Sequence, residues 1–131
     1  QEKTFLVLVH LLTNMEQWKK DAIAHAKECK PEESCGILAI KNNQTIYYKC
    51  KNVADELKTE SFIIEPIQYA DIEDETDEIV GIVHSHPQNI LVFSDADIYS
   101  CNSIDLPFYL VSPDSDKIET LLPNKIDAKK N

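Results

Sequence analysis

The sequence predicts an α/β protein with a single mixed β-sheet flanked by helices. Short apolar runs with strand character alternate along the chain with segments that have helical spacing. One near-continuous apolar run, Ile79–His84, is typical of a central strand that is covered on both faces. The length of 131 residues and the apolar content of 43% fit one domain. We place that domain over residues 15–123, followed by a polar tail over residues 124–131.

The N-terminal part of the chain contains one predicted strand and one predicted helix. Phe5–Leu12 is short, apolar and rich in strand-forming residues, and we assign it to an N-terminal extension over residues 1–14. A helix is expected over Met15–Cys29, because four residues at three- and four-residue spacing form one apolar face: Trp18, Ala22, Ala26 and Cys29. Pro31 ends that helix.

The next segment predicts a β-hairpin, a further strand and a short helix. Ser34–Ile40 and Thr45–Val53 have the composition of strands. The asparagines between them tolerate positive φ, so residues 41–44 are expected to form the hairpin turn. Ser61–Glu65 is predicted as a short strand, and Pro66 can open a helix that reaches about Asp71.

The remaining elements include an acidic connection, a helix and a final strand pair. Asp71–Glu78 carries six acids in eight residues, which predicts a solvated, mobile connection. Ser94–Ser103 is expected to be a helix with Ser94 as its N-cap. Leu106–Val111 and Lys117–Leu122 are predicted strands on either side of a turn.

The charge balance excludes several classes of partner. The formal net charge is −10, with 23 acidic residues against 13 basic ones, and every basic residue is a lysine. Nucleic-acid binders need a basic surface, so we expect no nucleic-acid partner, and an anionic membrane surface is equally disfavoured. The longest apolar run, Phe5–Leu12, is too short to cross a bilayer. A protein or peptide partner is the expected one.

The four cysteines do not form a recognisable metal motif. None belongs to a C-x-x-C pair, so a structural zinc ribbon is not expected. We predict reduced, mostly buried thiols in a cytoplasmic protein, at Cys29, Cys35, Cys50 and Cys101.

Two histidines at the end of the predicted central strand point to a metal. Side chains alternate faces along a strand, so His84 and His86 are expected on the same face. Two imidazoles on one face make half of a zinc site, and Asp97 in the first turn of the next helix is a candidate third ligand. Three protein ligands leave the fourth position open, which is the pattern of catalytic zinc.

Such a site also needs a base and a donor for the oxyanion. Glu33, beside a predicted core strand, is the candidate base, and the Ser94 hydroxyl is the candidate donor. Each residue taken alone has an ordinary explanation. The H-x-H pair is a weak signal, Ser94 with Asp97 is also a plain helix cap, and Glu33 is also an ordinary glutamate beyond a helix. The hypothesis depends on their joint spacing.

That spacing resembles the JAMM metalloprotease family, whose members carry MPN or JAB domains. The family pattern is an upstream glutamate followed by H-x-H-x7-S-x-x-D, and this sequence matches it at every defined position. The resemblance implies one catalytic zinc held by His84, His86 and Asp97. It also implies that Glu33 is the general acid and base and that Ser94 stabilises the tetrahedral intermediate. The implied fold is the MPN/JAB, cytidine-deaminase-like architecture.

A second motif narrows the resemblance. Pro31–Gly36 (PEESCG) is similar to the P-x-E-x-C-G segment of prokaryotic and phage members, and this register selects Glu33 rather than Glu32. The chain is similar to the phage minor tail protein K group from about Met15 to Leu122. Many proteins of that group carry an NlpC-type cell-wall peptidase domain next. The present chain is therefore either a stand-alone version or a fragment of a longer protein.

The resemblance implies three functions. The first is a zinc metallopeptidase that hydrolyses a peptide or isopeptide bond during phage tail assembly, in the host cytoplasm or in the virion. The second is a peptidase that trims the C-terminus of a ubiquitin-like or sulfur-carrier protein. The third is a non-catalytic MPN scaffold. A zinc nucleoside deaminase would need H-x-E and P-C-x-x-C, and the sequence has neither.

Overall fold

The computed structural model describes residues 17–124, which contain one five-stranded sheet. The strand order is β2-β1-β3-β4-β5, and β3 and β4 are parallel while the other neighbours are antiparallel. The mixed sheet that the sequence predicts is therefore confirmed. The strands are β1 (Cys35–Lys41), β2 (Gln44–Cys50), β3 (Glu78–Ser85), β4 (Phe108–Val111) and β5 (Glu119–Leu121).

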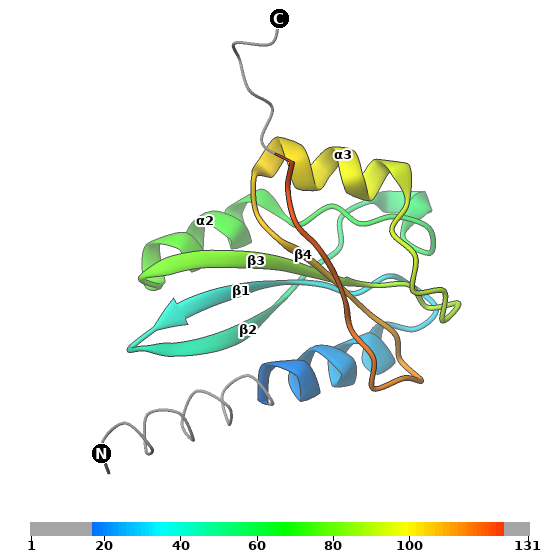
Figure 1. The fold of residues 1–131 in the computed structure, drawn as a ribbon, viewed down its shortest axis with the longest axis horizontal. Helices are drawn as coiled ribbons and strands as arrows, with labels where there is room; N and C mark the ends of the chain where they lie inside the picture. Colours follow the sequence, from blue (N-terminus) through cyan, green and yellow to red (C-terminus); the bar gives the residue numbers. More distant parts are fainter. Residues whose placement is uncertain (1–16, 125–131) are drawn as a thin grey trace, which may run out of the picture.

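Helices cover both faces of this sheet. The described part of the first helix spans residues 17–29, and it lies on the opposite face from α2 (Pro66–Glu75) and α3 (Asp95–Ile104), as Figure 1 shows. A short 3-10 helix, η1 (Asp55–Leu57), precedes α2. None of the described helices is long and apolar enough to span a membrane.

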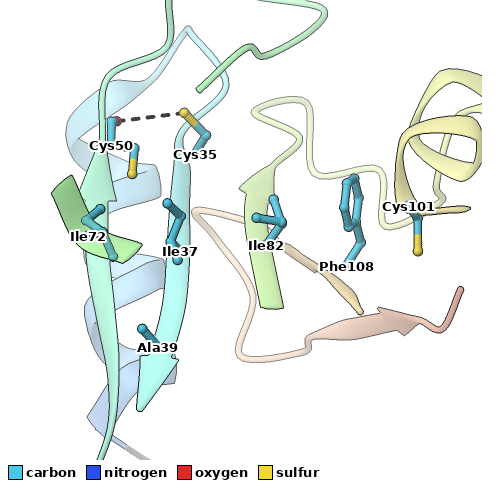
Figure 2. Packing of buried hydrophobic residues seen from close by; sticks show 8 residues of the cluster. All are labelled: Cys35, Ile37, Ala39, Cys50, Ile72, Ile82, Cys101 and Phe108. Carbon is cyan, nitrogen blue, oxygen red and sulfur yellow. Dashed lines mark hydrogen bonds between the residues drawn. The ribbon is translucent and has the colours of Figure 1, made fainter. Parts of the chain in front are cut away.

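The alternation of side chains along β3 divides the core into two clusters. Ile82 packs with Phe108 on the face that α2 and α3 cover, and both side chains are drawn in Figure 2. Val83 points the other way and packs in the cluster of Trp18, which comes from the first helix. His84 is two residues beyond Ile82, so its ring lies on the α2 and α3 face. The strand thus delivers a histidine to one face of the core.

The predicted hairpin is present and closes as expected. Residues of β1 and β2 pair directly up to Lys41 and Gln44, so the loop contains only two residues. These are Asn42 and Asn43, with φ of 52° and 64°. Two consecutive residues at positive φ match the twist of the flanking strands, which explains the asparagines at this position.

The predicted strand Ser61–Glu65 is wrong, and the strand predicted over Thr45–Val53 ends at Cys50. In place of a ladder there is one isolated bridge between Asn52 and Ile64. The Asn52 side chain forms hydrogen bonds with backbone groups of this region, including the Ser61 carbonyl and the Ile63 amide. A regular pair of strands therefore does not form. The pattern misled because Phe62 and Ile64 pack against the core without belonging to the sheet.

The acidic connection predicted over Asp71–Glu78 is also wrong. Helix α2 continues to Glu75, and β3 already begins at Glu78, so only two residues connect them. Ile72 is buried on the inner side of the helix while the acids around it remain exposed. The acids therefore form the solvated face of an amphipathic helix.

The last predicted elements are confirmed, with the helix shifted by one residue and the two strands shorter than predicted. Ser94 caps α3, and β4 and β5 pair as an antiparallel hairpin. The predicted strand Phe5–Leu12, the start of the first helix and the tail from residue 125 lie outside the described residues.

The four cysteines are free thiols, and three of them are buried. The Cys35 thiol donates a weak hydrogen bond to the Cys50 carbonyl at 3.8 Å (Figure 2). Burial raises the pKa of the Cys50 thiol to about 12. Three of the thiols pack in one core cluster, in agreement with the prediction of mostly buried cysteines: Cys35, Cys50 and Cys101.

Candidate metal centre

The two histidines meet at the carboxyl end of β3. His84 is the penultimate residue of the strand and His86 follows its end, and their ring centroids lie 5.1 Å apart. The His84 side chain is fully buried, and the His86 side chain is 13% exposed. The two rings therefore lie on one side of the chain, as the alternation of strand residues predicts.

Asp97 reaches both histidines from the first turn of α3. Its Oδ2 atom lies 3.2 Å from Nε2 of His84 and 3.3 Å from Nε2 of His86. The N-cap holds it there. The Ser94 hydroxyl accepts a hydrogen bond from the Asp97 amide at 3.0 Å, and Asp97 Oδ2 accepts one from the Ser94 amide at 3.0 Å. This reciprocal capping box fixes the start of the helix beside the strand end.

Glu33 enters the same cluster from the segment before β1. The Glu33 side chain is buried, and one of its carboxylate oxygens lies within 4.8 Å of ligand nitrogens of both histidines. Its backbone is anchored at both ends. The Glu33 amide donates to the Lys58 carbonyl at 2.7 Å, and the Glu33 carbonyl accepts from the Asn52 side chain at 3.1 Å. A carboxylate is thereby held next to the histidines.

The spacing of the donor atoms fits a tetrahedral metal. Zinc binds imidazole nitrogen at about 2.0–2.1 Å, so neighbouring ligand atoms around it lie roughly 3.3 Å apart. The two distances from Asp97 to the imidazoles, 3.2 and 3.3 Å, match that value. Nε2 of His84 nevertheless lacks the alignment of a hydrogen bond to any described residue. An unpaired buried imidazole facing a carboxylate suits a metal ligand set.

The hydrogen bonding of His86 and the burial of His84 both bear on metal binding. Nδ1 of His86 lies 2.8 Å from the carbonyl oxygen of Ile90. A carbonyl only accepts, so Nδ1 carries a hydrogen, and Nε2 is the nitrogen that faces Asp97. Burial lowers the pKa of His86, but the hydrogen bonds to Asp97 and to the Ile90 carbonyl outweigh it and raise the pKa above its ordinary value. At His84, burial lowers the pKa, although Asp97 offsets part of the effect. A neutral imidazole is the form that binds a metal.

The two carboxylates have opposite environments. Burial raises the pKa of Glu33 to about 7, with Asp97 adding to the rise and His86 opposing it. At Asp97 burial acts in the same direction, but the two imidazoles and the Ser94 amide outweigh it and hold the pKa well below its usual range. One carboxylate is thus kept ionised, while the other exchanges its proton near neutrality.

Aromatic residues shape the wall behind His84. The Phe62 ring stacks on the imidazole with centroids 4.6 Å apart, and the rings of Phe93 and Phe108 lie 6.1 Å away. Sequence reasoning missed these residues, as it missed the Ile90 carbonyl. The sequence does not show which residue a phenylalanine in an apolar run will contact, and it gives no indication of the partner of a backbone carbonyl.

The structure brings together the five residues that the sequence singled out. Four of them lie in contact with one another: Glu33, His84, His86 and Asp97. The fifth, Ser94, joins them through its hydrogen bond to the Asp97 amide. The acidic segment that ends at Glu78 does not border this cluster. Its last residue, Glu78, begins β3 six residues before His84, roughly 20 Å along the strand.

Comparisons with known proteins show the family to which the chain belongs. Residues 15–122 match the family described as prokaryotic homologues of the JAB domain. The chain is 38% identical over 110 residues to the tail tip assembly protein K of Escherichia phage N15, a match that covers 83% of this chain. The match covers only 44% of the length of that phage protein.

Two solved structures share the fold. The solution structure of protein DSY2949 from Desulfitobacterium hafniense superposes with a TM-score of 0.61 at 22% identity, over 79% of this chain and 77% of that one. The crystal structure of AF2198, a JAB1/MPN domain protein from Archaeoglobus fulgidus, gives a TM-score of 0.51 at 16% identity. That match covers 79% of this chain and 81% of the other.

Proposed function

Since this chain belongs to the family of prokaryotic homologues of the JAB domain, we propose that it is a zinc-dependent peptidase that hydrolyses a peptide or isopeptide bond. One observation carries the proposal. Two imidazoles and an ionised carboxylate converge at metal-ligand spacing, with a second buried carboxylate beside them. A scaffold needs no such cluster, because burying carboxylates and unpaired imidazoles opposes folding.

Each residue of the cluster suits a distinct role in hydrolysis. His84, His86 and Asp97 would hold the zinc. When bound, the ion supplies a Lewis acid that polarises the substrate carbonyl and lowers the pKa of a water molecule. Glu33 removes a proton from the attacking water, whose oxygen joins the carbonyl carbon. Glu33 then delivers that proton to the amine nitrogen as the carbon–nitrogen bond breaks, so the products are a carboxylic acid and an amine.

Ser94 suits the role of oxyanion donor. Its oxygen already accepts the Asp97 amide, so the single hydroxyl hydrogen remains available for a substrate carbonyl. The residue is exposed at the start of α3, next to the cluster. A hydrogen bond that strengthens as charge grows on the carbonyl oxygen lowers the barrier to hydrolysis.

For the biological setting we propose a role in phage tail assembly, on a protein or peptide substrate. The support is the 38% identity to a tail tip assembly protein. Such a role would place the chain in the host cytoplasm or in the virion. The trimming of a ubiquitin-like protein uses the same chemistry, so a ubiquitin-like substrate belongs in the same assay as tail proteins.

The test is the zinc content of the purified protein, measured by elemental mass spectrometry. We expect about one zinc per chain in the wild type and its loss in His84→Ala and in Asp97→Ala. His25→Ala is the matched control, because His25 is also buried but packs against Tyr47, in the core cluster of the opposite sheet face. A wild type that takes up no zinc would favour the scaffold function.

A further inference from the structure

A cavity of about 490 Å³ opens between α2 and α3, on the sheet face that carries His84. Its floor is formed by Ile82 and Phe108, which are 1% and 0% exposed. Ile63 and Ile104 stand at its rim, and they are 54% and 47% exposed. An apolar floor under exposed apolar side chains indicates a surface that is covered when a ligand binds.

The cavity is continuous with the candidate metal centre. Asp97 and Ser94 line its wall directly. Phe62 and Phe108 also line it, and both rings pack against the imidazole of His84. A group seated in this cavity therefore lies beside the atoms that would hold the zinc and polarise the substrate.

The chemistry of the lining selects the ligand. The lining residues include the carboxylates of Glu60 and Asp97 but no lysine or histidine, so an anionic ligand would meet only like charge. The remaining wall is apolar, apart from the hydroxyls of Tyr69 and of three serines: Ser61, Ser94 and Ser100. The volume is in the lower part of the roughly 300–1,000 Å³ range of ligand pockets. A single large apolar side chain with its backbone fits that space.

We propose that this cavity is the specificity pocket, and that it takes a leucine- or phenylalanine-sized side chain of a residue flanking the hydrolysed bond. The inference rests on the proposed peptidase function. The substrate class is thus a protein or peptide with a large apolar residue next to the cleavage site. The rim side chains Ile63 and Ile104 would close over the substrate backbone.

The binding test follows isoleucine methyl groups of the full chain by NMR. Ile64 and Ile82 report on the cavity, while Ile23 and Ile118 pack in the opposite core cluster and serve as references. The probes are N-acetyl-leucine N-methylamide and N-acetyl-alanine N-methylamide. We expect the leucine probe to shift the cavity signals and to bind at least about tenfold more tightly, since one methylene in an apolar pocket changes affinity about 10- to 200-fold.

Two serines of α3 provide matched variants. Ser100→Leu fills the cavity and should abolish the selective shifts, while Ser103→Leu adds the same side chain at an exposed position outside it and should preserve them. Equal affinity for the two probes, or selective shifts that persist in Ser100→Leu, would overturn the proposal that this cavity is the specificity pocket.

Hydrolysis of a random peptide mixture separates this inference from the peptidase proposal. Enrichment of large apolar residues beside the cleaved bond, lost in Ser100→Leu, would support both. Cleavage without any apolar preference would overturn the pocket and leave the peptidase standing. Selective binding of the leucine probe without hydrolysis of any peptide would instead remove the peptidase and retain an apolar side-chain site.

Discussion

The backbone amide of Ser34 donates a 2.8 Å hydrogen bond to the buried hydroxyl of Ser85, and the Ser85 amide donates to the Ser34 carbonyl at 3.1 Å. Ser34 follows Glu33 in the chain, and Ser85 separates His84 from His86. The candidate base and the two histidines are therefore held together where the start of β1 meets the end of β3. Their relative position is set by the same ladder that builds the sheet.

Ser85→Ala should destabilise the protein by about 1–3 kcal/mol, because the buried Ser34 amide loses its acceptor. Urea unfolding of the zinc-free protein measures the change. The matched control is Ser103→Ala at an exposed position, where we expect a change within about 0.5 kcal/mol. Equal stability of the two variants would contradict the structural role of the Ser85 hydroxyl.

Glu33→Gln should retain zinc and lose hydrolysis by about 10²- to 10⁴-fold, the usual contribution of a general base. The amide keeps the size of the side chain but cannot take the proton. Zinc content and turnover of any substrate found are measured on the same preparation. Glu32→Gln, one residue away and exposed, is the control and should keep full activity. Full activity in Glu33→Gln would show that Glu33 is not the general base.

Asn52→Ala should cost at least about 3 kcal/mol of unfolding free energy, because buried backbone groups lose their partners. The Asn52 amide nitrogen donates to the carbonyls of Glu33 and Ser61, and its oxygen accepts from the amides of Ala54 and Ile63. Asn52→Asp keeps the two acceptor contacts and loses the two donor contacts.

Denaturant unfolding measures both Asn52 variants. We expect both to be destabilised, and a neutral Asn52→Asp would show that the bond to the Glu33 carbonyl contributes nothing. Asn52 is a positioning residue in this scheme, since it reaches the cluster only through the Glu33 backbone. In Asn52→Asp, turnover should therefore fall while zinc content is retained, an outcome that a purely structural role does not require.

The pH dependence of stability should contain a contribution from His25. Burial lowers its pKa from the ordinary value of 6.5, with Lys49 adding to this and Glu28 opposing it. The unfolded chain therefore binds the proton more readily than the folded one, so stability is complete above pH 6.5 and falls as the pH drops through that value. Its Nδ1 atom and the Tyr47 hydroxyl are also 2.7 Å apart.

The measurement is urea unfolding between pH 5 and pH 8. We expect His25→Gln to lose less stability than the wild type between pH 7 and pH 5, because the variant has no imidazole to protonate. Identical pH profiles would show that the His25 pKa is not lowered in the folded protein. The comparison cancels the titration of the other groups, which both proteins share.

Residue spacing predicted the site better than it predicted the connections. His84, His86, Ser94 and Asp97 lie on one strand end and one helix start, and such local geometry is encoded by alternation and capping. The segment around Phe62 was misassigned because a single side chain, that of Asn52, replaces its ladder. Contacts of that kind join residues far apart in the sequence.

Gly36 belongs to the PEESCG motif, but the sequence does not show why a glycine is needed there. A Cβ atom there would collide with the ring of Tyr47, which lies across the strand on the face opposite His84. The glycine of the PEESCG segment therefore serves packing next to the site and not chemistry. Nothing in the sequence pairs it with Tyr47, eleven residues later.

The floor of the apolar cavity has a bearing on how the protein can diverge. Ile82 and Phe108 belong at once to the hydrophobic core and to the proposed pocket, so a mutation there changes stability and preference together. Ile63, Ile104 and Ser100 line the same space from its rim, where a change leaves the sheet intact. Related proteins with other substrate preferences should therefore differ at the rim residues and retain the residues of the cavity floor.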